Sequence, residues 1–364
     1  MTMKKWIARF SLPLTALAVF GMTQVLIRFP FITEQYYTQK LYPVLASFLS
    51  SFSRWFPFSL ADLFYLLLIL TAVTVVLLLI LKKISFSFAG LFVLNTLAVV
   101  YIFFYIFWGF NYFRSDMNTR LEIKTQDSDP KEFLRVLGQI VEATNASWHP
   151  YDDFSKSITD SLVETSFSRL APVLKIKYPM GSRRAKNITF SSFFAQAGIS
   201  GYYGPFFNEV HINRYLLPSE YAFVLAHEKA HQFGVTGEAE ANFIAWMVCT
   251  HSESRQLQYA ANLVTLRYFL NHAARYEQLP EIIKTIDTRV IEDIKEIQNH
   301  WMGLRNVKVE RVASKVNDAY LKTNQVEQGI RDYTGIVKHI MDYSLDSTFR
   351  KSVDEYSFSG NSYE

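Results

Sequence analysis

The sequence predicts a mainly α-helical protein, with three N-terminal transmembrane helices followed by a helix-rich α+β domain that contains a small β-sheet. Three observations lead to this fold class. Half of the 364 residues are hydrophobic, and the longest uncharged stretches lie before residue 114. Between residues 187 and 217, β-rich runs alternate with glycine and proline, which indicates short strands joined by turns. From Ser219 onward the pattern is helical almost to the end.

The overall composition excludes several classes of protein. Charged residues make up 19% of the chain, below the roughly 25% of soluble proteins. The net charge of +4 is spread along the sequence, so we expect no nucleic-acid partner. The single cysteine, Cys249, rules out an internal disulfide and any CxxC site.

Three hydrophobic stretches are each long enough to cross a membrane, because ~30 Å of hydrocarbon takes about 20 apolar helical residues. The predicted transmembrane helices cover residues about 10–28, 62–82 and 84–108. The first stretch could instead be a signal peptide with a basic start, but no small-residue cleavage site follows it, so an uncleaved anchor is favoured. Residues 1–113 are therefore interpreted as a membrane region in contact with the lipid bilayer.

The orientation of this region follows from the positive charges near the helix ends. Lys4, Lys5 and Arg9 precede the first helix, and Lys82 and Lys83 stand in the short turn between the second and third. Both segments belong on the same side, and the positive-inside rule places that side in the cytoplasm. We therefore predict a multi-pass cell membrane protein whose C-terminal part is extracytoplasmic.

The chain after the membrane region is divided into a main domain, residues 114–300, and a C-terminal helical extension, residues 301–364, that packs on it. Asp129 followed by Pro130 predicts the start of a helix. Strands of a small sheet are expected over residues 188–194 and 207–213. Ser219 is the predicted N-cap of a helix that Gly234 can terminate.

The helix after Ser219 carries the residues with the clearest chemistry. In "LAHEKAHQF", His227 and His231 stand four residues apart and project from one helix face, with Glu228 between them. Two imidazoles on one face can hold a zinc ion, while the glutamate reaches its water, as in the HExxH pattern of zinc metalloproteases. The sequence therefore predicts a Zn²⁺ site with Glu228 as the general base of a hydrolysis.

A zinc ion that keeps one position open for water needs a third protein ligand. In "GEAEAN", Gly237 allows a turn, after which Glu238 and Asn242 share one face of a new helix. We predict Glu238 as the ligand and Asn242 as a hydrogen-bond partner of a ligating histidine. Glu240 is the alternative ligand. Lys229, inside the motif, is expected to point to solvent.

Other candidate residues are less clearly marked. An oxyanion stabiliser is expected, with Tyr259 as a candidate beside His251 and Tyr320. By analogy with zincin folds, the strand "FFNEVHIN" is expected to be an edge strand that pairs with an extended peptide. His211 on that strand is interpreted as structural, and Cys249 as a small buried hydrophobe.

Four segments resemble a bacterial membrane family known as domain of unknown function 3810: "FWGFNYFR", "GISGYYGPFFNEVHIN", "AHEKAHQFGVTGEAEANFIAWMVC" and "DAYLKTNQVEQGIRDYTGIV". The resemblance covers nearly the whole chain and implies a zincin-like domain behind three transmembrane helices, in a family whose substrates are not established. "ExxAN" also resembles the third-ligand segment of repressor-cleaving HExxH peptidases and the "ExxAD" of peptidases that process prenylated proteins. This likeness implies Glu238 as ligand and places Asn242 where those peptidases have an aspartate, without its charge.

These observations predict a membrane-anchored zinc-dependent peptidase that acts on a peptide or membrane-protein substrate. Two other classes stay open: a metalloprotease-type membrane sensor or signal transducer, and a zinc-bound inactive scaffold. The intact Glu228 argues against the scaffold, since an inactive domain has no need of a base. The sequence shows no appended DNA-binding or sensor domain, which weakens the sensor interpretation.

Overall fold

The structure is a computed structural model that describes residues 3–125, 129–181 and 183–358. By the contacts within it, the chain divides into two compact units. The first comprises Met1–Ser115, Met180–Arg183 and Gly204–Glu209, and the second comprises Asp116–Pro179, Arg184–Tyr203 and Val210–Glu364. The second unit contains both the HExxH segment and the C-terminal helices.

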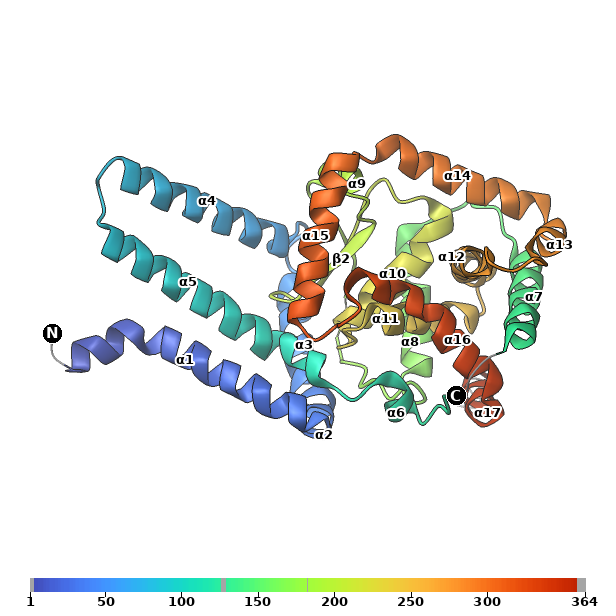
Figure 1. The fold of residues 1–364 in the computed structure, drawn as a ribbon, viewed down its shortest axis with the longest axis horizontal. Helices are drawn as coiled ribbons and strands as arrows, with labels where there is room; N and C mark the ends of the chain where they lie inside the picture. Colours follow the sequence, from blue (N-terminus) through green and yellow to red (C-terminus); the bar gives the residue numbers. More distant parts are fainter. Residues whose placement is uncertain (1–2, 126–128, 182, 359–364) are drawn as a thin grey trace. The chain divides into compact units, whose positions relative to one another are not determined.

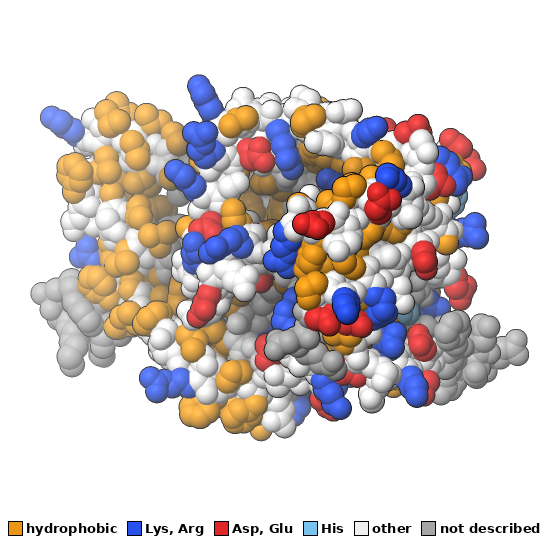
Figure 2. Space-filling view, turned by 45° about the vertical axis from the view of Figure 1, so that its right-hand side comes forward, with side chains coloured by type: hydrophobic (Ala, Val, Ile, Leu, Met, Phe, Trp, Pro, Cys, Tyr) orange, Lys and Arg blue, Asp and Glu red, His pale blue; other side chains and the backbone are white. Residues whose placement is uncertain are grey.

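The first unit is built around three long helices, α1 (Met3–Arg28), α4 (Leu60–Ile80) and α5 (Phe86–Phe107), with α5 packed against the other two (Figure 1). Shorter elements complete the unit: α2 (Pro30–Ile32), the π-helix η1 (Thr33–Leu41), α3 (Tyr42–Ser53) and the 3-10 helix η2 (Gly109–Phe113). In the described residues, three helices are long and apolar enough to cross a membrane. Their hydrophobic side chains form much of the surface of this unit (Figure 2).

Serine caps define where two of the long helices begin. The Ser59 side chain accepts a hydrogen bond from the backbone N–H of Asp62 at 2.8 Å, and Ser85 does the same for Phe88 at 3.2 Å. The start of α4 is held further by the Glu209 carboxylate, which accepts from the backbone N–H groups of its first two residues. A carboxylate is favourable there because the helix dipole is positive at its N-terminus.

The second unit consists mostly of helices around a central pair, α10 (Pro218–Gln232) and α11 (Glu238–Thr250) (Figure 1). The pair packs against α8 (Lys156–Leu170) and α12 (Arg255–Ala273), and α12 in turn packs against α7 (Pro130–Ser147). The remaining helices are α6 (Met117–Leu121), α9 (Ser191–Gln196), α13 (Leu279–Lys284), α14 (Thr288–Leu304), α15 (Val307–Thr323), η3 (Gly329–Gly335), α16 (Ile336–Leu345) and α17 (Ser347–Phe358). The mainly helical fold class is thus confirmed.

The small sheet has the strand order β1-β3-β2, with β1 (Lys186–Asn187) parallel to β3 (Glu209–Ile212) and β2 (Gly201–Gly204) on the other side. The expected strand over 207–213 is found as β3. Its start is later because Asn208, at φ +53°, forms the turn. The strand predicted over 188–194 is wrong. There β1 has already ended, and the Ser191 hydroxyl donates to the Ile188 carbonyl as α9 begins.

The core of the second unit surrounds α10, α11 and α12, and it includes side chains that the sequence marked as structural. Cys249 is fully buried, as predicted, and burial raises the pKa of its thiol. His211 is also fully buried, with its ring stacked on Tyr202 at 4.3 Å between centroids. The predicted helix start is confirmed, since Asp129 accepts from the N–H of Glu132 ahead of α7.

Candidate metal centre

The HExxH residues lie on α10, which starts at Pro218 and ends before Gly234. The predicted N-cap, Ser219, is wrong by two residues: Leu217 is the extended cap residue, and Pro218 takes the first helical turn. Proline suits this position because its fixed φ matches the helix and its missing N–H has no partner there. Gly234 has a φ of +88°, the left-handed conformation that allows the chain to leave the helix.

Glu238 is the first residue of α11, following the extended cap residue Gly237. The loop between the two helices is short, so α10 and α11 pack side by side and the start of α11 faces the histidines. Within this loop the Val235 carbonyl lies 2.8 Å from Nδ1 of His231. That contact orients the ring so that Nε2 points toward Glu238.

His227, His231 and Glu238 bring three ligand atoms together in a buried site. The two histidine Nε2 atoms are 3.1 Å apart, and Oε2 of Glu238 lies 3.1 Å from one and 3.3 Å from the other. Two donor atoms bound to a tetrahedral zinc ion at about 2.0–2.1 Å are about 3.3 Å apart, so the donor set and its spacing fit a metal ion. Oε2 of Glu238 is also buried without a hydrogen-bond partner of good geometry among the described residues.

The ionisable side chains of the site are buried, and they change one another's pKa. Burial favours the neutral form of Glu238, but the charges of His231 and His227 more than offset this and hold its pKa below the usual range. Burial likewise opposes protonation of His231, while the Glu238 carboxylate raises its pKa overall. Burial raises the pKa of Glu228, and Glu238 adds to this effect while the histidines reduce it.

Glu228 lies directly against strand β2. A Cβ atom at Gly201 would be 2.9 Å from Oε1 of Glu228 and 3.0 Å from the His211 carbonyl oxygen, closer than side chains pack. Glycine is therefore required where the strand passes the carboxylate. The expected edge strand is wrong: β3, from "FFNEVHIN", is the central strand, and β2 is an outer strand of the sheet.

Glu240 and Lys229 both have partners from distant segments. Glu240 forms a salt bridge with the buried Arg120 instead of joining the histidines. The expectation that Lys229 points to solvent is wrong, because its side chain is 0% exposed. Its Nζ lies 2.8 Å from Oδ1 of Asp160 and 2.5 Å from Oε1 of Glu164, both on α8. Two carboxylates on the neighbouring helix make this burial possible.

Asn242 and Tyr259 have contacts other than those predicted. Nδ2 of Asn242 donates to the Tyr333 carbonyl at 3.1 Å, and no hydrogen bond joins Asn242 to a histidine in the described part of the chain. The Tyr259 hydroxyl donates to Asp293 in the core of the unit. No described contact brings Tyr259 to the three ligand atoms, so it does not suit the role of oxyanion stabiliser.

The two alternatives to Tyr259 lie at the end of α11 and on α15. The Nδ1 atom of His251 contacts the Met247 carbonyl at the end of α11. Tyr320 is on α15 and is 39% exposed.

The segment η3 contacts both helices of the site, although its sequence gave no sign of this role. Asp332 accepts a hydrogen bond from the first turn of α11, and the Tyr333 ring lies parallel to that of His227, with centroids 6.3 Å apart. Both residues belong to "DAYLKTNQVEQGIRDYTGIV". Nothing in the local pattern links this segment to a motif about ninety residues earlier.

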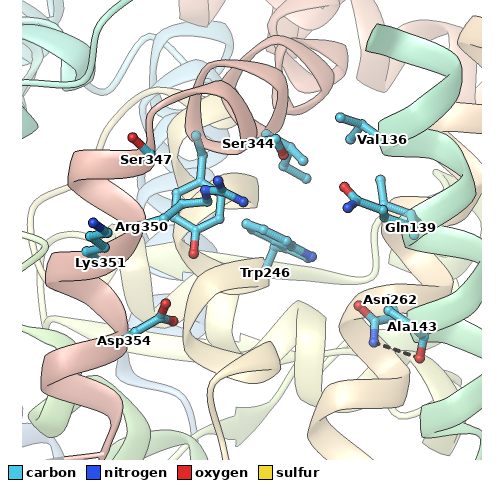
Figure 3. A pocket seen from close by; sticks show the side chains of 13 residues that line it. Val136, Gln139, Ala143, Trp246, Asn262, Ser344, Ser347, Arg350, Lys351 and Asp354 are labelled. Atoms are coloured by element: carbon cyan, nitrogen blue, oxygen red, sulfur yellow. Dashed lines mark hydrogen bonds between the residues drawn. The ribbon is translucent and has the colours of Figure 1, made fainter. Parts of the chain in front are cut away.

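A separate cavity of about 500 Å³ lies elsewhere in the second unit, and none of the three candidate ligands nor Glu228 lines it. Trp246 lies between two helices whose side chains form opposite walls (Figure 3). Helix α17 supplies Arg350, Lys351 and Asp354, and α7 supplies Val136, Gln139 and Ala143. The lining of this cavity combines charged and apolar side chains.

Comparison with known proteins identifies a family and nothing more specific. The model of DUF3810, a protein family of unknown function, matches residues 37–341. Since this range is most of the chain, the protein belongs to that family. The match includes the HExxH segment, Glu238 and the η3 segment. No curated protein and no solved structure matches the chain.

Proposed function

We propose that this protein is a membrane-anchored zinc peptidase with a zincin-like site. One observation carries the proposal: His227, His231 and Glu238 converge with metal-ligand spacing, and Glu228 stands between the two histidines in the sequence of the same helix. This combination of a three-ligand site and a neighbouring general base is what hydrolytic zinc enzymes use.

The ligands and the base have different tasks in this proposal. His227, His231 and Glu238 hold the zinc ion, which when bound supplies a Lewis acid that lowers the pKa of water to about 7. A carboxylate oxygen of Glu228 accepts a proton from the attacking water as the water oxygen forms its bond to the peptide carbonyl carbon. Glu228 then delivers that proton to the amide nitrogen as the carbon–nitrogen bond breaks, releasing an amine and a carboxylic acid.

Strand β2 is the element best placed to hold a substrate. It is an outer strand of the sheet and passes Glu228 at Gly201, where the backbone comes close to the carboxylate. An extended peptide can add to such a strand through backbone hydrogen bonds. In this arrangement the scissile bond lies beside Glu228.

Three apolar helices support the membrane part of the proposal. With Lys82 and Lys83 in the turn between α4 and α5, the positive-inside rule puts that turn in the cytoplasm and the metal centre outside. A reporter enzyme that works only outside the cytoplasm, fused after Glu364, should be active. Activity of only a cytoplasmic reporter would reverse the topology and direct the search for substrates to the cell interior.

The decisive test of the peptidase proposal uses the full chain purified in detergent. We expect about one zinc ion per chain and chelator-sensitive hydrolysis of peptides from a broad library. Glu228→Gln keeps the shape and removes the proton acceptor, so zinc should stay bound while hydrolysis falls by at least about a hundredfold. The exposed Glu253 provides the matched control, since Glu253→Gln should leave both unchanged.

Two results would contradict the proposal. A Glu228→Gln protein that hydrolyses the peptide as fast as the wild type would remove Glu228 from the mechanism. A wild type that binds zinc but leaves the whole library intact would favour the sensor or scaffold alternatives over the peptidase.

A further inference from the structure

The 3-10 segment η3 lies against the first turn of α11, the turn that carries Glu238. Oδ2 of Asp332 accepts a hydrogen bond from the backbone N–H of Ala239 at 3.0 Å. The cap residue of α11 is Gly237, which has no side chain to satisfy that turn. Asp332 therefore supplies, from 93 residues away, the acceptor that a local cap residue normally provides.

Two further contacts hold η3 close to the same helix. The Asn242 amide, one turn further along α11, donates to the backbone carbonyl of Tyr333 at 3.1 Å. A Cβ atom at Gly335 would lie 2.7 Å from the Cβ of Ala239, so glycine is needed for the close approach. The start of α11 is thus fixed by side-chain and backbone contacts from one segment.

The Tyr333 side chain extends from η3 to the ligands themselves. Its ring is within 15° of parallel to the His227 ring, and its hydroxyl interacts with the Glu238 carboxylate and with Asn317. A tyrosine hydroxyl, with an ordinary pKa of about 10, carries its proton at neutral pH and can donate it to the Glu238 carboxylate in a hydrogen bond.

We propose that η3 is a clamp that positions Glu238 for the metal ion, with Asp332 and Tyr333 as its positioning residues. Asp332 acts through the backbone of α11, and Tyr333 through the carboxylate that it faces. This inference rests on the proposed zinc site and adds the residues that orient its third ligand. Partners behind metal ligands commonly change metal affinity by about 10- to 100-fold when they are removed.

The experiment measures metal affinity, so it does not require a substrate. Full chain in detergent is stripped of metal, and zinc binding is measured by competition with a chromogenic chelator for wild type, Asp332→Ala and Tyr333→Phe. Both variants should bind zinc about 10- to 100-fold more weakly. Cobalt(II) titration should give a visible absorption spectrum that is altered in both, because Glu238 is held less firmly beside the ion.

Two matched controls separate positioning from general stability. Asp287 accepts from the Arg289 N–H at the start of α14, so Asp287→Ala removes an equivalent helix cap elsewhere in the unit. Tyr343→Phe removes a hydroxyl from α16. The Tyr343 ring contacts Phe243 and Trp246, neither of which is a candidate ligand. Both controls should bind zinc and cobalt as the wild type does.

The outcomes distinguish this inference from the proposed function. A wild type that binds no zinc removes the metal site and the clamp together. A wild type that binds zinc, with both variants binding it equally tightly and giving the same cobalt spectrum, overturns the clamp and leaves the metal site standing. If Asp332→Ala does not fold, Tyr333→Phe decides alone, because it removes one oxygen atom and keeps the ring.

Discussion

Helices α4 and α10 contrast in which residues they expose: α4 exposes apolar side chains, whereas α10 buries charged and polar ones. Helix α4 is almost wholly apolar, yet only the first three of its 21 residues are buried. Helix α10 carries a lysine, two glutamates and two histidines, yet thirteen of its fifteen residues are buried. The exposed apolar area of α4 would be unfavourable in water, and the buried charges of α10 would be unfavourable without partners.

The difference indicates that the two helices suit different environments. In hydrocarbon, the exposed apolar surface of α4 would contact lipid and avoid the cost that it carries in water. Two charges of α10 meet opposite charges inside the second unit: Lys229 meets Asp160 and Glu164, and Glu220 meets Arg267. Four substitutions test this comparison, in decreasing order of the free energy that each should cost.

Removing the buried charge of α10 should have the largest effect. Lys229→Ala leaves Asp160 and Glu164 facing each other without a cation, so we expect a loss of about 3–5 kcal/mol of stability. The measurement is chemical unfolding of the full chain in detergent. Lys229→Met together with Asp160→Asn and Glu164→Gln should recover much of the loss. A single variant as stable as the wild type would show that the three charges are not paired.

Adding a charge to the exposed face of α4 tests the other side of the comparison. Leu70 lies at the middle of the helix and is 51% exposed. Leu70→Arg should make membrane insertion less favourable by about 2.5–3.5 kcal/mol, measured with an insertion reporter. Leu81→Arg, just beyond the helix end, is the matched control and should cost little because the side chain can reach the interface. Equal insertion of both variants would argue against a hydrocarbon environment for α4.

A methyl group beside Glu228 tests how tightly the polar interior is packed. Gly201→Ala should cost about 1–3 kcal/mol, since the added Cβ overlaps Glu228 and the His211 carbonyl. Unfolding measurements should show this loss, and peptide hydrolysis should fall as Glu228 is displaced. Gly303→Ala is the control, because no atom lies within 4 Å of a Cβ there, and it should not destabilise the protein. A Gly201→Ala protein with wild-type stability would mean that β2 can move away from the carboxylate.

The smallest effect is expected at the start of α4. Ser59→Ala removes the side-chain acceptor for the Asp62 N–H and should cost about 1 kcal/mol. The Glu209 carboxylate still accepts hydrogen bonds from the two preceding N–H groups, which should keep the loss of stability small. Ser59→Thr keeps a hydroxyl acceptor and should retain most of the stability in the same unfolding measurement. Equal losses in the two variants would show that the cap hydrogen bond contributes nothing.

Much of the fold was predictable because its signals are local. Long uncharged stretches predicted the three apolar helices, and Asp129 with Pro130 predicted the start of α7. Spacing of four residues was enough to place His227 and His231 on one helix face. The strand predicted over residues 188–194 failed because a run of aromatic residues favours a strand only when neighbouring strands can receive it.

Local sequence specifies the long apolar helices, the HExxH face of α10 and the turn that starts α11 at Glu238. These features depend on backbone geometry within a few residues, which the order of amino acids controls directly. Long-range packing, in contrast, pairs Glu240 with Arg120, buries Lys229 against α8, places β3 at the centre of the sheet and sets η3 as the cap of α11. Each of these contacts depends on a partner far along the chain. The residues next to a charged or hydrogen-bonding side chain do not indicate which distant residue will pair with it in the folded protein.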